Sequence, residues 1–352
     1  MMLKRFYEID LLRFIAAISV VFYHYGFRGY AADNMTIMPY SYIAPLAKYG
    51  YLGVDLFFVI SGFVIFMTAS AGSARRFLVS RIVRLYPAFW VCCTVTFLVI
   101  VASEDKRYSA SLYQYAINMT MLSEFFRVKP IDGVYWSLFV EIKFYVLVLL
   151  ILLTRQINRS KELLGLWLII VLLISKWPLR YIDFFLIPDF APYFIAGAMF
   201  YLINSEGVCF YKIFIITTSY FIILNNAFHN ITSMEIHFNS KFNVTVITII
   251  LTLIFIVLFL ISIDNRTRKF TSRFTSERWL LLLGGLTYPT YLIHQNIGFI
   301  IFNSAYPYLN PHFLIIGTIS TILLIAYIIH IKVEKRCSRP MKVFLDRFLR
   351  IT

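Results

Sequence analysis

The sequence predicts an all-α, polytopic membrane protein, a bundle of about ten transmembrane helices with both chain ends on the inner side of the membrane. Composition is the first observation: the 352-residue chain is 60% hydrophobic and 14% charged, with a mean hydropathy of +0.76. Soluble domains are about 45–50% apolar and about 25% charged. The second observation is that the apolar runs are continuous, without the alternation of outer-membrane strands, so helices are expected rather than a barrel.

Each apolar run is long enough for a helix to cross the hydrocarbon core, which takes about 20 residues. The predicted spans are 9–27, 50–69, 82–102, 135–153, 163–179, 182–204, 209–227, 243–263, 280–302 and 313–331. Little sequence lies outside them, and it contains no internal repeat or low-complexity tract. We therefore expect one integral-membrane domain over residues 1–352, whose chemistry uses the helices themselves.

The net charge is +15. Lys and Arg gather in alternate connecting segments, most densely in 264–279 and after Lys332, which fits the positive-inside rule with both ends inside. We attribute the high pI to topology and expect no nucleic-acid partner. The C-terminal stretch is also partly amphipathic, which suits contact with membrane lipid. The four cysteines form no disulfide framework and no CxxC pattern, so no metal site is expected.

The first predicted span, IDLLRFIAAISVVFYHYGF, carries groups that a membrane helix normally avoids. An intramembrane charge costs roughly 2.5–3.5 kcal/mol on insertion scales. Arg13 and His24 lie within about 20° of each other around the helix and about 16 Å apart along its axis. Taken singly, Arg13 also fits a surface anchor and His24 a hydrogen-bonded packing residue.

Later spans carry further polar groups at a similar predicted depth. Asp55, Glu141 and His294 project with His24 to the middle or outer half of the membrane. Structural ion pairing is the alternative interpretation of the two carboxylates, because an unpaired carboxylate is costly there. The candidate substrate-binding residues are His294, Ser61 and Tyr291.

A basic group is predicted at the inner edge. The stretch SRIVRLYPAFW places Arg81 and Arg84 three residues apart, on one helix face. Two guanidiniums on one face suit a phosphate or pyrophosphate, although topology alone also explains inner arginines. Together with Arg13 they lie below the acid–base cluster. This order suits an enzyme that takes a phosphorylated donor from inside and an acceptor from the other side.

Four stretches together resemble the integral-membrane acyltransferase 3 family. They are IDLLRFIAAISVVFYH, GVDLFFVISGFVI, SRIVRLYPAFW and VYWSLFVEIKFY. The likeness continues through LTYPTYLIHQ and YIIHIKVEKRCSRP and so covers nearly the whole chain. The usual Glu-Glu-Gln-Phe-Tyr motif reads EIKFY here, which keeps Glu141 but changes its neighbours. Some members carry an extracytoplasmic SGNH-type domain, whereas this chain resembles a stand-alone member.

The resemblance implies a ten-helix O-acyltransferase of the bacterial inner membrane. It implies transfer of an acetyl group from cytosolic acetyl-CoA to a hydroxyl of a cell-surface or lipid-linked glycan, such as an O-antigen, capsule or exopolysaccharide. It also implies that four residues are essential: Arg13, His24, Arg81 and Arg84. The three arginines are expected to bind the CoA phosphates.

His24 is expected to act as general base, because imidazole has a pKa near neutral. Glu141 or Asp55 is expected to orient it, as the acid does in a catalytic triad. Tyr288, Tyr291 and Ser61 are candidate oxyanion stabilisers. The sequence has no GxSxG elbow, so a serine acyl-enzyme is not expected, while direct transfer and an acyl-His24 intermediate both remain open.

Two other classes of protein fit part of the pattern. Buried His, Asp and Glu residues also suit a proton-coupled exporter of a sugar or lipid, but the halves of the chain show no paired Gly/Pro-broken helices. A non-catalytic partner of a polysaccharide machine has little reason to keep intramembrane charges. The acyltransferase interpretation is therefore preferred.

Overall fold

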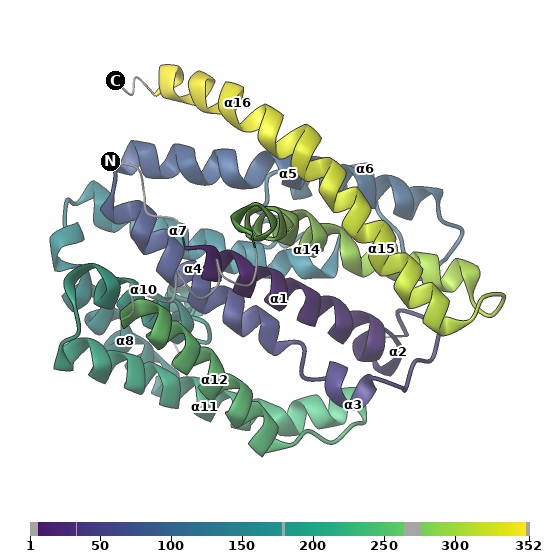
Figure 1. The fold of residues 1–352 in the computed structure, drawn as a ribbon, viewed down its shortest axis with the longest axis horizontal. Coiled ribbons are helices and arrows are strands. Elements are labelled where there is room, and N and C mark those ends of the chain that lie inside the picture. Colours follow the sequence, from purple (N-terminus) through teal and green to yellow (C-terminus); the bar gives the residue numbers. More distant parts are fainter. Residues whose placement is uncertain (1–5, 33, 178–179, 264–275, 350–352) are drawn as a thin grey trace. The chain divides into compact units, whose positions relative to one another are not determined.

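The computed structural model describes residues 6–32, 34–177, 180–263 and 276–349, and within these ranges every regular element is helical (Figure 1). The first half of the chain contains α1 (Tyr7–Tyr23), η1 (His24–Arg28), α2 (Gly29–Ala31), α3 (Ala44–Ala47), α4 (Leu52–Ser70), α5 (Ala74–Ala102), α6 (Leu112–Asn118), η2 (Gly133–Tyr135), α7 (Trp136–Leu153) and η3 (Ile157–Arg159). The second half contains α8 (Ser160–Lys176), α9 (Arg180–Leu186), α10 (Ala191–Glu206), α11 (Phe210–Phe238), α12 (Val244–Ile263), α14 (Glu277–Ala305), α15 (Pro311–Ile329), η4 (His330–Glu334) and α16 (Lys335–Phe348). The all-α class predicted from the sequence is confirmed for the described residues.

A helix lies at each of the predicted spans. Among the described residues, seven helical stretches are long and apolar enough to cross a membrane: Tyr7–Ala31, Ala44–Ser70, Ala74–Ala102, Gly133–Leu153, Tyr181–Glu206, Val244–Ile263 and Pro311–Phe348. The other predicted spans fall on α8, α11 and α14, so the count of about ten and the inward position of both ends stay predictions. Most of the basic connection 264–279 lies outside the described residues.

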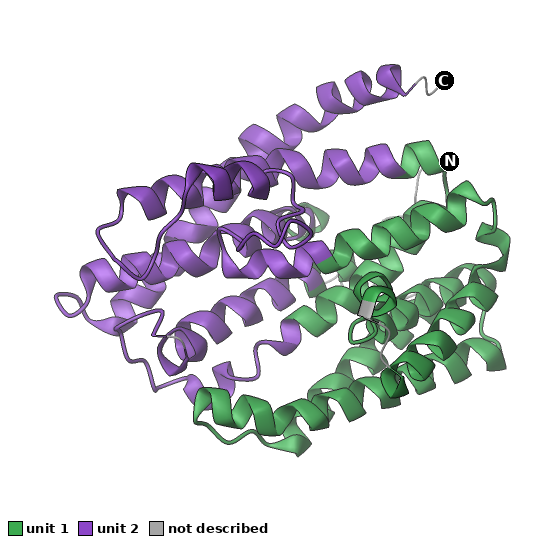
Figure 2. Cartoon of the chain, turned by 180° about the vertical axis from the view of Figure 1, so that it is seen from behind, with its two compact units in different colours: residues 1–12, 54–77, 140–280 green, residues 13–53, 78–139, 281–352 purple. Residues whose placement is uncertain are grey.

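The chain forms two compact units whose segments alternate along the sequence (Figure 2). Unit 1 comprises residues 1–12, 54–77 and 140–280, and unit 2 comprises 13–53, 78–139 and 281–352. The single domain expected over residues 1–352 stays a prediction.

Unit 1 is organised around α10, which packs against α8, α11 and α12. Its aromatic core includes Phe144 stacked on Phe194, with ring centroids 4.4 Å apart. Close packing against α4 depends on Gly197, because a Cβ there would collide with the carbonyl oxygen of Val59. Small residues of this kind let membrane helices approach closely.

Unit 2 has its core where η1 meets α14 and α15. The buried residues of this cluster are Val21, Tyr25, Met38, Phe299, Phe302, Leu314 and Ile315. Tyr25 holds η1 to α14 because its hydroxyl donates a 2.6 Å hydrogen bond to the carbonyl oxygen of His294. Gly298 provides the room, since a Cβ there would overlap the Tyr25 ring.

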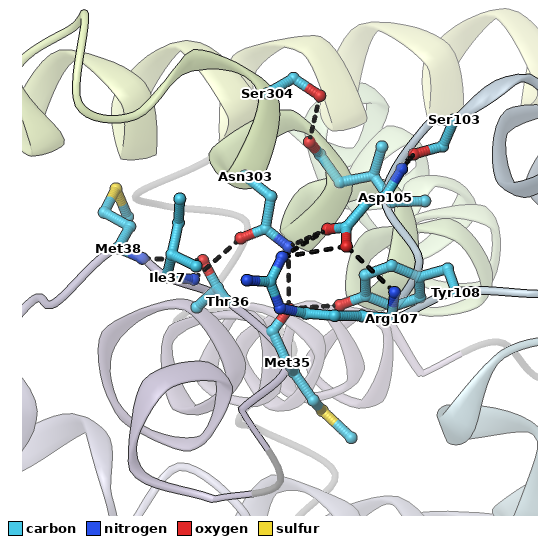
Figure 3. A network of polar contacts seen from close by, with 11 residues as sticks. Met35, Thr36, Ile37, Met38, Ser103, Asp105, Arg107, Tyr108, Asn303 and Ser304 are labelled. Carbon is cyan, nitrogen blue, oxygen red and sulfur yellow. Dashed lines mark hydrogen bonds and ion pairs between the residues drawn. The ribbon is translucent and has the colours of Figure 1, made fainter.

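A polar junction fixes two loops of unit 2 to the C-terminal part of α14 (Figure 3). The Asn303 amide donates to the Asp105 carboxylate at 2.6 Å and to the Met35 carbonyl at 3.0 Å. Arg107 donates to the same carboxylate at 2.9 Å, and Tyr108 donates to the Met35 carbonyl at 2.5 Å. The loop after α2 and the loop after α5 are thus tied to the helix that carries His294.

Candidate active site

Two buried histidines meet in unit 2. His24 begins η1, a π-helical turn that continues α1, and π-helical turns are frequent at functional sites. Its Nδ1 lies 2.9 Å from Nε2 of His294 on α14 and 3.0 Å from the Val20 carbonyl oxygen. The second nitrogen of His294, Nδ1, lies 2.8 Å from the Tyr291 carbonyl oxygen.

These contacts determine where the protons sit on the neutral pair. A carbonyl oxygen only accepts, so Nδ1 of His294 carries the hydrogen and its Nε2 carries a lone pair. That lone pair and the Val20 carbonyl both face Nδ1 of His24, which must therefore be a donor. The Nε2 of His24 is left with a lone pair, and it is buried without a hydrogen-bond partner. This is the arrangement of a general base held by its other nitrogen.

Other buried polar atoms of unit 2 have no hydrogen-bond partner among the described residues. They include Nε of Arg28, Oγ1 of Thr290, Oε1 of Gln295 and Oγ1 of Thr318. Arg28 follows His24 by one turn of η1, and its charge acts on both His24 and Asp132. Most buried polar groups are hydrogen-bonded, so an unsatisfied donor such as Nε of Arg28 is a candidate contact for a substrate.

Asp132 links the loop before α7 to α14. Its fully buried carboxylate accepts hydrogen bonds from the backbone N–H of Asn296 at 3.0 Å and of Val134 at 3.2 Å. Burial raises the pKa of Asp132 to about 7, although both N–H groups and the Arg28 charge favour the ionised form. Gln295, the neighbour of His294, packs against Gly133, where a Cβ would collide with its amide.

The arginines predicted to bind phosphate lie on α1 and α5. Arg81 and Arg84 share one α-helix, as predicted, and Arg84 places its guanidinium 5.7 Å from the Tyr288 ring centroid. Its Nη1 lies 3.4 Å from Oε1 of Glu334 on η4. Glu334 in turn faces His330, with Oε2 and Nδ1 2.5 Å apart. Arg84 therefore contacts a buried carboxylate while its own side chain stays 32% exposed.

The predicted carboxylates lie in unit 1. Oγ of Ser61 donates a 2.7 Å hydrogen bond to Oε1 of Glu141, and Asp55 accepts one from Tyr193. The predicted contact between His24 and either carboxylate joins residues of different units and stays a prediction. Within unit 2, the group that faces Nδ1 of His24 is His294.

The structure thus divides the predicted residues into two groups. Unit 2 contains Arg13, His24, Arg81, Arg84, Tyr291 and His294, and unit 1 contains Asp55, Ser61 and Glu141. The Tyr291 hydroxyl contacts Oγ of Ser137 at 2.7 Å, so it is already engaged within unit 2. The substrate-binding roles of His294, Ser61 and Tyr291 stay predictions.

Sequence reasoning missed four residues that adjoin these groups. They are Arg28, Asp132, Gln295 and Glu334. Glu334 had a usable signal, because its position four residues after His330 puts both on one helix face. Asp132 and Gln295 carried no comparable signal, since their neighbours are distant in sequence.

Comparison with known proteins identifies the family. The profile of the acyltransferase 3 family, described as an acyltransferase domain, matches residues 6–330. The chain belongs to the acyltransferase 3 family. This confirms the resemblance predicted from the motifs and, at the level of the family, the prediction of an acyltransferase enzyme. The family match and the seven long apolar helices of the described residues together identify an integral membrane protein.

Three relatives illustrate the similarity of this acyltransferase family member to known proteins. ORF330 of Acidianus two-tailed virus is 29% identical over 46% of this chain and 45% of its own length. Nodulation protein 10 of Rhizobium leguminosarum bv. viciae is 27% identical over 48% of this chain and 49% of its own. The O-acetyltransferase OatA of Staphylococcus aureus is 30% identical over 44% of this chain and 25% of its own.

The acyltransferase chain therefore spans about half or less of the length of these curated relatives. No solved structure is significantly similar to it.

Proposed function

We propose that the protein is a membrane O-acyltransferase that moves an acetyl group from acetyl-CoA to a hydroxyl of a cell-surface or lipid-linked glycan, with His24 as general base. The observation that carries this proposal is the buried Nε2 lone pair of His24, whose other nitrogen is held by His294 and the Val20 carbonyl. The family and the name of OatA support transfer of an acetyl group to oxygen.

The chemistry follows from the two ring nitrogens. Nε2 of His24 takes the proton of the acceptor hydroxyl as that oxygen attacks the thioester carbonyl carbon. The tetrahedral intermediate collapses, the carbon–sulfur bond breaks, and the thiolate of CoA receives the proton from Nε2. His294 accepts a hydrogen bond from Nδ1 of His24 throughout, which stabilises the imidazolium formed in between.

The negative charge on the thioester oxygen needs a donor in the transition state. The three hydroxyls suggested by the sequence are already engaged: Tyr291 contacts Ser137, Tyr288 donates to the Leu85 carbonyl oxygen, and Ser61 donates to Glu141. Nε of Arg28 is a buried donor without a partner and lies close enough to His24 for their charges to interact. We propose that Nε of Arg28 donates the hydrogen bond that stabilises this oxyanion.

In this proposal acetyl-CoA binds to the arginines through its phosphates. The side chain of Arg84 stays 32% exposed beside its 3.4 Å contact with Glu334, and a guanidinium matches phosphate geometry. Arg81 and Arg13 are proposed to share the phosphates with it. The acceptor approaches from the other face of a bacterial inner membrane, as the predicted depth order of the polar residues suggests.

The test is acetyl transfer from radiolabelled acetyl-CoA in proteoliposomes that contain the purified protein, with a crude surface-glycan fraction as acceptor. Wild type is expected to release CoA and label glycan. His24→Ala should lose at least about 100-fold in rate. His229→Ala is the matched control, because His229 is exposed on α11 and belongs to unit 1.

Transfer by His24→Ala at the wild-type rate would overturn the assignment of His24. Release of CoA without any acceptor would favour an acyl-His24 intermediate over direct transfer. If wild type neither binds nor consumes acetyl-CoA with any acceptor, the donor assignment fails as well.

A further inference from the structure

The last helix of the chain extends well beyond the length that a membrane span requires. Figure 1 shows α15, η4 and α16 as one continuous rod. The 19 residues of α15 alone are about 28 Å long, which nearly matches a hydrocarbon core of about 30 Å. The 14 residues of α16 therefore lie at or beyond the membrane surface.

The side chains of α16 divide into an apolar and a basic face. Successive residues turn by about 100° around the axis, which gathers one set on a single side. The apolar set is Cys337, Met341, Phe344, Leu345 and Phe348. Arg336 and Arg347 border this face on one side and Lys342 on the other, while Lys335 and Arg339 lie opposite.

The described part of the chain leaves most of the apolar face exposed, with only Met341 and Leu345 partly covered. No residue of α16 is buried. Phe344 is 66% exposed and Phe348 is 73% exposed, although their rings stack on each other. An exposed apolar stripe on a helix requires a covering surface.

We propose that α16 lies in the plane of the membrane surface and binds anionic phospholipid. A strongly amphipathic helix with low overall hydrophobicity and Lys or Arg on its polar side is typical of interfacial helices. Five basic residues against one acidic residue, Asp346, favour an anionic surface over a zwitterionic one. The attachment to α15 already places α16 at the surface, so only its apolar face has to enter the headgroup layer.

In the structure α16 continues from α15 as one rod, and two features provide sites at which the helix can bend into the surface plane. The π-helical η4 lies between α15 and α16, and Pro340 lies within α16. Proline removes one backbone hydrogen bond, and both features are common sites of helix bending. This surface role is independent of the chemistry proposed for His24.

The test uses the native Cys337 as a reporter in the full-length protein. Cys92 and Cys93 are buried, so Cys209→Ser leaves Cys337 as the exposed thiol. The protein is labelled there with an environment-sensitive fluorophore and reconstituted in vesicles of phosphatidylcholine, with or without phosphatidylglycerol. We expect a blue shift and about twofold stronger quenching by brominated acyl chains in the anionic vesicles, both weakened by high salt.

Substitutions distinguish the contribution of the basic side chains to membrane binding from that of the apolar side chains. Lys342→Glu combined with Arg347→Glu should reduce the signal in anionic vesicles to the level in phosphatidylcholine. Phe344→Ser should weaken quenching in both vesicle types, and Lys161→Glu on α8 should change neither. The substitutions on α16 are at exposed positions, and the reporter is the same in each protein.

Equal quenching in both vesicle types that survives the charge reversal would overturn the proposal. A blue shift that increases with the protein-to-lipid ratio would overturn it too, because a second copy would then cover the apolar face.

Discussion

Nε2 of His294 lies 2.9 Å from Nδ1 of His24, although 270 residues separate the two histidines along the chain. His294 therefore occupies the place that an acid holds in a catalytic triad. In the proposed mechanism it acts as a positioning residue for His24, and its neutral imidazole stabilises a transient positive charge without adding a permanent negative one.

We expect His294→Ala to lower kcat about 100-fold while KM for acetyl-CoA changes little, because the substitution removes the acceptor that orients His24. His294→Gln should recover part of the rate, since its amide oxygen can accept the same hydrogen bond. His312→Ala is the control. His312 lies at the start of α15, where its ring contacts the Tyr40 hydroxyl at 2.9 Å. An increase in KM at constant kcat would instead favour the substrate-binding role predicted from the sequence.

Arg84→Lys should raise KM for acetyl-CoA by about 10-fold with kcat nearly constant, because an ammonium keeps the charge but loses the planar fork that matches a phosphate. Steady-state kinetics in proteoliposomes measures both constants. Arg76→Lys, an exposed position on the same helix, should behave as wild type. Equal KM values for Arg84→Lys and wild type would contradict phosphate binding by Arg84.

The pH dependence of stability should report on Asp132. Its pKa of about 7 in the folded protein exceeds the value of about 3.9 expected in an unfolded chain. Between these values the folded state binds more protons, so this residue's contribution to stability is full at acidic pH and decreases by up to about 1.4 kcal/mol per unit as pH rises towards 7.

Thermal unfolding in detergent across that range should therefore show a shallower slope for Asp132→Asn than for wild type. Glu104→Gln, at an exposed position in the loop after α5, is expected to keep the wild-type slope. Identical slopes for Asp132→Asn and wild type would show that the carboxyl titrates normally.

Gly197→Ala should destabilise unit 1 by about 1–3 kcal/mol, because the new Cβ would overlap the Val59 carbonyl and push α10 away from α4. Gly317→Ala in α15 meets nothing within 4 Å and should be neutral or stabilise the helix by up to about 1 kcal/mol. Melting temperatures of the two variants in one detergent give the comparison. Equal melting temperatures would argue against close packing at Gly197.

The sequence predicts the positions of the helices better than it predicts the contacts within the candidate active site. Continuous apolar runs placed a helix at every expected span, because a membrane helix satisfies its backbone internally and needs no distant partner. The spacing of Arg81 and Arg84 is likewise a local property of α5. The motifs also sufficed to predict the family that the profile match confirms.

The partners of the polar residues could not be predicted in the same way. The contact between Ser61 and Glu141 spans 80 positions, and that between Asp132 and Asn296 spans 164. Periodicity within one helix carries no information about which helix packs beside it. The contact between His294 and His24 could not be predicted for this reason, since nothing local to α14 points to His24, and the substrate-binding role predicted for His294 stays a prediction.

The long separation of His24 and His294 also has a consequence during biosynthesis. Chains grow at about 5–20 residues per second, so α14 leaves the ribosome some tens of seconds after α1. Until then Nδ1 of His24 has only the Val20 carbonyl to hold it. In the proposed mechanism, the nascent protein therefore acquires its oriented base only after the helices that carry the three arginines have been made. A chain that stops before α14 lacks the group that orients His24 and would not consume the thioester.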